Sequence, residues 1–149
     1  MFSVTEKPID VSFLFHDISF REYGAIASFA GIVRRESDSR PVRALKYEAY
    51  VPMALKSFEK IAGEIRNRWG EVHLTIVHRV GFLRAGEIAV LVAAASKHRR
   101  ESLAACSYAI DRVKQISPIW KKEYYEDQGA GWVESCESAH CEVQNVQSY

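Results

Sequence analysis

Two lysines, Lys114 and Lys121, lie on either side of Pro118 in this sequence. Lys114 falls on the last turn of an expected helix, and Lys121 falls on the strand that is expected to follow it. Because proline ends a helix and the chain turns there, both ammonium groups can reach one place. Lysines held beside an apolar stripe and near other cations are candidates for acid–base or covalent chemistry. The sequence therefore predicts a cationic site built on this pair.

The alternation of side chains leaves the role of each lysine open. In the expected strand, Lys121 shares a face with Ile119, whereas Lys122 shares the other face with Trp120. Alternation alone does not select the lysine that points inward. Lys114 also has a simpler interpretation, in which its stem packs on the apolar stripe while its amine reaches water.

A second cationic cluster, Lys97-His98-Arg99-Arg100, comes at the start of the helix expected at residues 99–116. Ser96 is expected to cap that helix, which places His98 and Arg99 at its N-terminus. The free backbone N–H groups there, together with the helix dipole, favour an anion. Cations in a first turn oppose the dipole by ~0.3–1 kcal/mol each. Several of them together indicate a negatively charged ligand, unless the cluster is a solvated face.

Arg34 ends a run of small and β-branched residues, 24–34, which is expected to form a buried strand. Its planar guanidinium suits a phosphate group, because it can donate two parallel hydrogen bonds to one. Arg34 could therefore add to an anion-binding site.

Two helices and six or seven strands are expected to position these residues. The strands are expected at residues 11–15, 24–34, 44–50, 72–80, 87–95, 119–125 and 132–134. The first helix begins near Pro52 and ends at Gly70. The second has an inward face made of Leu103, Cys106, Ile110 and Val113. Helices among strands that are joined by hairpin-length turns favour an α+β fold.

The composition is that of a globular protein of ordinary size. The 149 residues are expected to form a single domain, with flexible tails at residues 1–8 and 137–149 and a mobile loop at 35–41. A net charge of +1 argues against a nucleic-acid partner. The sequence has no apolar run near the ~20 residues that span a bilayer, so no membrane is expected. Three cysteines without Cys-x-x-Cys spacing favour reduced thiols in a cytoplasmic protein, with no metal site.

Five short motifs carry a resemblance to a known family. They are Gly31–Arg34, Tyr47–Ala54, His78–Glu87, Ser96–Arg99 and the run from Lys114 through Pro118-Ile119-Trp120 to Lys121. They lie in order between residues 24 and 134, and with them the chain resembles the large, catalytic subunit family of molybdopterin synthase. One such motif would be weak evidence, but five in register make a strong signal.

The resemblance implies a fold and an activity. The fold would be an α/β hammerhead core with an additional small antiparallel β-region, assembled as a homodimer within a heterotetramer. The activity would be that of a sulfurtransferase in molybdenum cofactor biosynthesis, with no cofactor of its own. Sulfur from the thiocarboxylated C-terminal glycine of a small ubiquitin-like subunit would pass to cyclic pyranopterin monophosphate and form the molybdopterin dithiolene.

The resemblance also implies residue roles. Lys114 and Lys121 would be catalytic and contact the substrate, while Arg34, His98 and Arg99 would bind its phosphate and pterin. Family members often carry a basic residue shortly after the Trp-Val-Glu of the last strand, where this chain has Ser135-Cys136. That difference leaves open whether this segment contributes to a neighbouring protomer.

A different class of function remains as an alternative. A non-catalytic dimeric scaffold that binds an anionic peptide tail or a ubiquitin-like partner would also need cations. Such a scaffold would tolerate replacement of lysine by arginine, whereas a catalyst generally would not.

Overall fold

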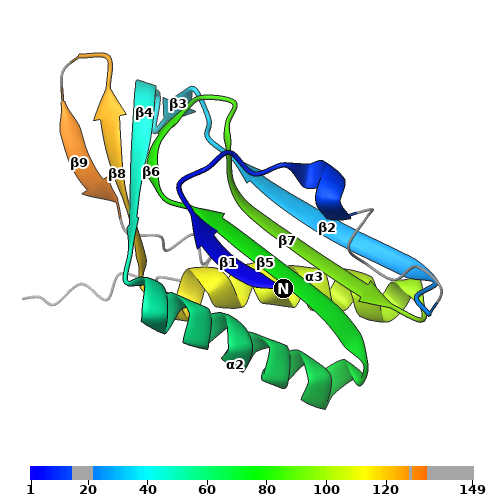
Figure 1. The fold of residues 1–149 in the computed structure, drawn as a ribbon. Coiled ribbons are helices and arrows are strands. Elements are labelled where there is room, and N and C mark those ends of the chain that lie inside the picture. The colour runs from blue at the N-terminus through cyan, green and yellow to red at the C-terminus, as the bar shows by residue number, and fades with distance from the viewer. Residues whose placement is uncertain (15–21, 128, 134–149) are drawn as a thin grey trace, which may run out of the picture.

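A four-stranded sheet and two helices form the larger part of the molecule (Figure 1). The computed structural model describes residues 1–14, 22–127 and 129–133. The strand order of this first sheet is β1-β5-β7-β2, in which β1 pairs parallel with β5 and the other pairs are antiparallel. The strands are β1 (Phe2–Thr5), β2 (Ala25–Ile32), β5 (Val72–Arg79) and β7 (Ile88–Ser96). The helices α2 (Val51–Trp69) and α3 (Arg99–Ile116) lie together on one face of it.

A second, antiparallel sheet lies at one end of the first (Figure 1). Its path is β3-β4-β8-β9, and β6 pairs with β4 beside that path. The strands are β3 (Glu36–Ser37), β4 (Arg40–Ala49), β6 (Gly81–Arg84), β8 (Ile119–Tyr125) and β9 (Ala130–Val133). The predicted α+β fold, a helix-covered core with a small antiparallel region, is therefore confirmed.

The core lies between the two helices and the first sheet. Phe58, Ile61 and Ile65 form the buried stripe of α2 and are at most 1% exposed. They share one core cluster with Ile76 of β5 and Ala94 of β7. The helix ends at Gly70, whose φ of 74° favours glycine, as the sequence predicted.

The N-terminal segment differs from its prediction as a loose tail. Phe2–Thr5 is a strand in register with residues 76–79 of β5, and the Met1 amine donates to the Leu74 carbonyl at 2.8 Å. The strand predicted at residues 11–15 is also wrong, because Val11–Phe13 is a short 3-10 turn. The Asp10 side chain accepts a hydrogen bond from the Ser12 N–H at 2.9 Å and so caps that turn.

The loop predicted at residues 35–41 is instead a short hairpin between β3 and β4. Asp38 and Ser39 have φ of 48° and 62°, the left-handed conformation that two-residue hairpin turns require. The strand β6 was not predicted, and it fills what the sequence indicated as a turn between β5 and β7.

Two burial predictions are also wrong. The residues 24–34 were expected to be a buried strand, but β2 is the edge of the first sheet, and Phe29 and Ile32 are 39% and 56% exposed. Leu103 is 61% exposed, whereas Cys106, Ile110 and Val113 face inward as predicted. The buried stripe of α3 also uses the small residues Ser102, Ala105 and Ala109.

Two further predictions concern the cysteines and the ends of the chain. Cys106 is buried, and its burial raises the pKa of the thiol to about 11, which fits a core residue rather than a reactive one. The tail predicted at residues 137–149 lies outside the described residues. Among the helices of the described part, none is long and apolar enough to cross a bilayer.

Candidate functional site

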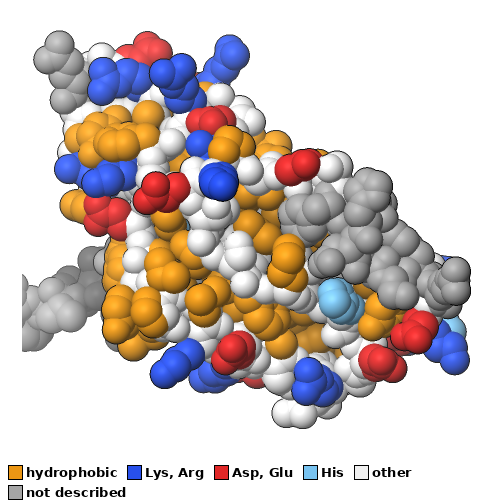
Figure 2. Space-filling view, viewed as in Figure 1, with side chains coloured by type: hydrophobic (Ala, Val, Ile, Leu, Met, Phe, Trp, Pro, Cys, Tyr) orange, Lys and Arg blue, Asp and Glu red, His pale blue; other side chains and the backbone are white. Residues whose placement is uncertain are grey.

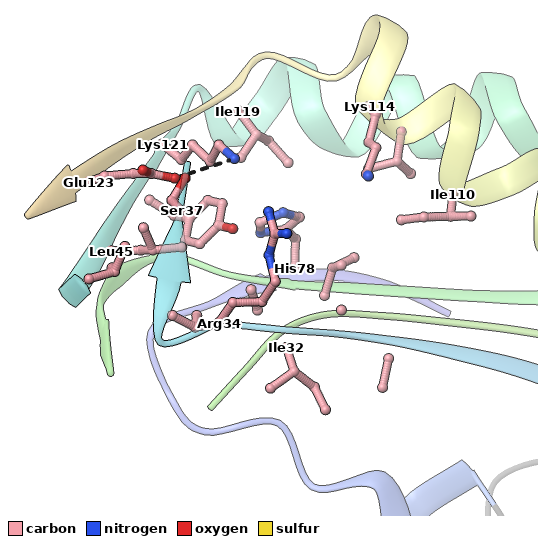
Figure 3. A pocket seen from close by; sticks show the side chains of 18 of the residues that line it. Ile32, Arg34, Ser37, Leu45, His78, Ile110, Lys114, Ile119, Lys121 and Glu123 are labelled. Carbon is pink, nitrogen blue, oxygen red and sulfur yellow. Dashed lines mark ion pairs between the residues drawn. The ribbon is translucent and has the colours of Figure 1, made fainter. Parts of the chain in front are cut away.

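A pocket of about 280 Å³ lies where the two sheets meet the end of α3 (Figure 3). Arg34, Lys114 and Lys121 line it, so the structure brings together three of the five predicted site residues. Polar residues of β4, β5 and β8, among them Tyr47, His78 and Glu123, also line this pocket. Apolar side chains complete the wall: Ile110, Val113, Ile119, Leu45, Val42 and Val90.

The pleat of β8 decides which of the adjacent lysines enters the pocket. Ile119 and Glu123, which share a face with Lys121, are 8% and 3% exposed. Lys122 lies on the opposite face, where its amine approaches the Trp132 ring at 5.7 Å. The structure thus selects Lys121, a choice that alternation alone had left open. Its Nζ lies 3.7 Å from a carboxylate oxygen of Glu123, the ion pair drawn as a dashed line in Figure 3.

Lys114 reaches the same pocket from the last turn of α3. The helix ends at Ser117, whose N–H donates to the Val113 carbonyl, and Pro118 then turns the chain into β8. Figure 3 shows the Lys114 side chain directed from the helix into the pocket, toward the strands on its opposite side. The residue as a whole is exposed.

Arg34 follows the end of β2 and lines the pocket from the first sheet. In Figure 3 its guanidinium rises from that sheet toward the two lysines. The three cations therefore come from a strand end, a helix end and a strand of the second sheet.

His98 and Arg99 lie elsewhere in this chain. His98 lines a separate pocket of about 290 Å³ with Tyr23, Trp69 and Glu101, and Arg99 is an exposed residue that lines neither pocket. The N-cap is His98 rather than the predicted Ser96. The Ser96 hydroxyl is directed away from the helix N–H groups, because it donates to the His98 carbonyl at 2.7 Å.

His78 is a pocket residue that the sequence did not identify as one. Its neighbour Arg79 pairs with Glu87 at 2.8 Å, whereas His78 makes no ion pair within the described residues. The His78 ring is buried and meets the Tyr47 ring edge-on, with centroids 5.2 Å apart. Burial lowers the pKa of His78 to about 4. Alternation gave no signal for it, because both faces of β5 are buried here: Thr75, Ile76 and Val77 are at most 5% exposed.

Glu123 anchors the polar wall of the pocket. Its carboxylate accepts a hydrogen bond from the Tyr125 hydroxyl at 2.8 Å, in addition to the contact with Lys121. The Arg40 guanidinium stacks 3.7 Å above the Tyr125 ring and pairs with Asp127 at 2.8 Å. A chain of contacts therefore runs from the exposed Asp127 through Arg40, Tyr125 and Glu123 to Lys121, and it holds the Lys121 side chain in its orientation.

The site is suited to bringing anions together rather than to holding a metal. Within the described residues no group of histidine, cysteine or carboxylate side chains could bind a metal ion. Three cationic side chains around an apolar-walled pocket can hold two negatively charged reactants side by side and stabilise charge that develops between them.

Comparison with known sequences gives consistent matches along this chain. A family model described as MoaE protein matches residues 4–116. The molybdopterin synthase catalytic subunit of Nostoc is 41% identical over 141 residues, covering 93% of this chain and 86% of that protein. The protein of the same name from Bacillus subtilis is 42% identical over 132 residues, covering 89% and 83%.

Solved structures agree with the sequence matches. The crystal structure of molybdopterin synthase from Staphylococcus aureus is similar with a TM-score of 0.83 and 40% identity, covering 87% of this chain and 94% of that one. A complex of subunits 1 and 2 of molybdopterin-converting factor from Helicobacter pylori has a TM-score of 0.72. At 22% identity, that second similarity shows the fold alone.

Proposed function

Because this chain belongs to the MoaE protein family, we propose that it acts as a molybdopterin synthase catalytic subunit in molybdenum cofactor biosynthesis. It is a sulfurtransferase whose substrate is cyclic pyranopterin monophosphate. The sulfur donor is the thiocarboxylated C-terminal glycine of a small ubiquitin-like subunit, and two transfers make the dithiolene of molybdopterin.

The observation that carries this function is the shared pocket of Arg34, Lys114 and Lys121. Both reactants are anions, because one carries a phosphate and the other a thiocarboxylate. Two unit charges 4 Å apart repel by about 4 kcal/mol at an effective dielectric constant of 20. Three cations offset that repulsion and hold the sulfur close to the carbon that it attacks.

Within this pocket the residues have distinct roles. Arg34 binds the phosphate, since its fork can donate two hydrogen bonds to it. Lys114 and Lys121 contact the reacting carbon and the carbonyl of the donor tail, where an amine can move a proton or hold the acyl group. Glu123 keeps the Lys121 amine directed inward through the 3.7 Å contact.

A homodimer within a heterotetramer fits the exposed edge of the first sheet. The edge strand β2 exposes Phe29 and Ile32, apolar side chains that a second copy would cover. A two-fold axis places the same surface of both copies in contact. The small subunit binds at the pocket, into which its tail extends.

The same arrangement gives His98 and Arg99 a place in the site. Gly24, at the start of β2, donates to the Ser96 carbonyl, so the N-terminus of α3 lies at that end of the strand. Arg34 lies at the other end. Two copies of β2 related by a two-fold axis run antiparallel, so each start lies near the partner's end. His98 and Arg99 of one protomer would then approach the pocket of the other and bind substrate there.

Reconstitution tests the catalytic function. Purified chain, thiocarboxylated small subunit and cyclic pyranopterin monophosphate are mixed, and the product is identified by mass spectrometry. We expect Lys114→Ala to fold and to bind the small subunit, yet to lose at least 100-fold in turnover, because the amine acts on the reacting atoms. Lys114→Arg retains the charge and should lose nearly as much, since a guanidinium cannot exchange its proton at neutral pH.

The arginine variant distinguishes an enzyme from a scaffold. Near-wild-type product formation by Lys114→Arg would mean that only positive charge is needed there, and the catalytic assignment of Lys114 would be withdrawn. No product from the unmodified chain would contradict the proposed function itself.

A further inference from the structure

His78 presents one nitrogen whose bonding is fixed and one that is open to the pocket. Its Nδ1 lies 2.9 Å from the Arg79 carbonyl oxygen, which can only accept a hydrogen bond. The Nδ1 atom therefore carries the proton, and Nε2 of the neutral ring carries a lone pair. Within the described residues, Nε2 has no hydrogen-bond partner, and the residue lines the pocket.

The ring is held in place by its surroundings. It is 6% exposed, the Tyr47 ring packs edge-on against it, and strand β5 fixes its backbone between β1 and β7. In Figure 3, the ring lies below Lys114 and Lys121, on the side of the pocket opposite the helix. An acceptor fixed in this way can act on a ligand without first reorganising.

We propose that Nε2 of His78 accepts a hydrogen bond from an N–H or O–H group of the bound substrate, which makes His78 a substrate-binding residue. This inference rests on the proposed function, because the ligand is a heterocycle that carries such donors in addition to its phosphate. The cations of the pocket bind the anionic part of the substrate, and His78 recognises the part that has hydrogen to donate.

The uncharged state of the ring explains why a histidine suits this position. The cationic residues that line the pocket, Arg34, Lys114 and Lys121, can only donate hydrogen bonds. A carboxylate acceptor at this position would repel both anionic reactants, whereas a neutral imidazole accepts a hydrogen bond without adding negative charge. Burial lowers the pKa of His78 to about 4, so the ring stays uncharged and the lone pair remains available at neutral pH.

Steady-state kinetics of two His78 variants test this role. His78→Phe keeps a planar ring for Tyr47 to pack against but has no lone pair, and we expect the KM for cyclic pyranopterin monophosphate to rise at least tenfold while kcat changes less than threefold. His78→Gln restores an acceptor oxygen and should recover most of that loss. His73→Phe is the matched control, since it changes the same residue type on the same strand away from the pocket and should leave KM unchanged.

Inhibition by sulfate separates recognition from a change of pocket shape. Sulfate has acceptor oxygens and no hydrogen to donate, so it binds the cations alone. We expect the same sulfate inhibition constant for His78→Phe and the unmodified chain. A KM within twofold of wild type in His78→Phe, no recovery in His78→Gln, or a parallel rise of the sulfate constant would each overturn the role of His78. Only absence of product from the unmodified chain would count against the proposed function.

Discussion

The two faces of the second sheet carry similar residue types but differ in what surrounds them. Toward the pocket, Lys121 lies between the buried Ile119 and Glu123. On the outward face, Lys122 lies among Tyr124 and Trp132, and its amine approaches both rings. Figure 2 shows hydrophobic and cationic side chains gathered together over this end of the molecule.

The difference between these faces shows that position in the pleat determines which lysine is functional. Lys122 can make contacts of about 0.5–1 kcal/mol with the Tyr124 and Trp132 rings on the outward face. Lys121 is held by a buried carboxylate beside a cavity, where its charge is screened less and can act on a ligand. Adjacent residues of the same type therefore have separable roles.

Replacement of each lysine in turn by alanine gives the largest expected difference in turnover. Lys121→Ala should lower turnover at least 100-fold, because it removes an amine that contacts the reacting atoms. Lys122→Ala should stay within twofold of wild type in the same mass-spectrometric assay, since its side chain points away from the pocket. Equal losses in both variants would mean that general positive charge, rather than the inward amine, supports the reaction.

The same comparison can be made for stability on β6. Leu83 is fully buried below the sheet, whereas its neighbour Phe82 is 61% exposed on the outward face. We expect Leu83→Ala to reduce the free energy of unfolding by about 2–4 kcal/mol, because it leaves a cavity. Phe82→Ala should reduce it by less than about 1 kcal/mol, through loss of the contact with Tyr124. Urea denaturation of both variants measures the difference, and a larger loss from Phe82→Ala would mean that the outward face is not solvent-exposed.

The parts of this fold that the sequence predicted well are those with local signals. Pro52 and Gly70 mark the ends of α2, and the turn at Pro118 separates α3 from β8, so these boundaries could be read from neighbouring residues. The motif order predicted the family, and with it the lysines of the pocket. Each of these inferences needed only a few consecutive residues.

The parts that were missed depend on contacts between distant segments. The strand β1 exists because it pairs with residues 76–79, far along the chain, and its own four residues carry no comparable signal. The inward direction of Lys121 depends on which face of β8 the first sheet covers. The separation of His98 from Lys114 follows from the length of α3, whose two ends hold them. Local pattern alone specifies none of these relations.

An ion pair between α2 and α3 provides a stability control, because it lies away from both faces of the second sheet. The Glu64 carboxylate accepts from the Arg112 guanidinium through both oxygens at 2.8 Å, and from the Tyr108 hydroxyl at 2.7 Å. Arg112, and then Tyr108, lower the pKa of Glu64 to about 2, from an ordinary value of 4.5. We expect Glu64→Gln to reduce stability by about 1–2 kcal/mol at pH 7, a modest effect for a bridge partly open to solvent.

The pH dependence of that loss identifies its cause. The pKa of Glu64 is lower in the folded than in the unfolded chain, so the bridge stabilises fully above about pH 4.5, and its contribution declines as the pH falls toward 2. Urea denaturation at pH 7, 5, 4 and 3 should therefore show the two proteins converging below pH 4.5, with turnover at pH 7 unchanged. A difference that is constant with pH would assign the loss to packing. A fall in turnover would mean that the contact between α2 and α3 positions Lys114. Stability and catalysis would then depend on the same residues, contrary to the separation that the two faces of the second sheet indicate.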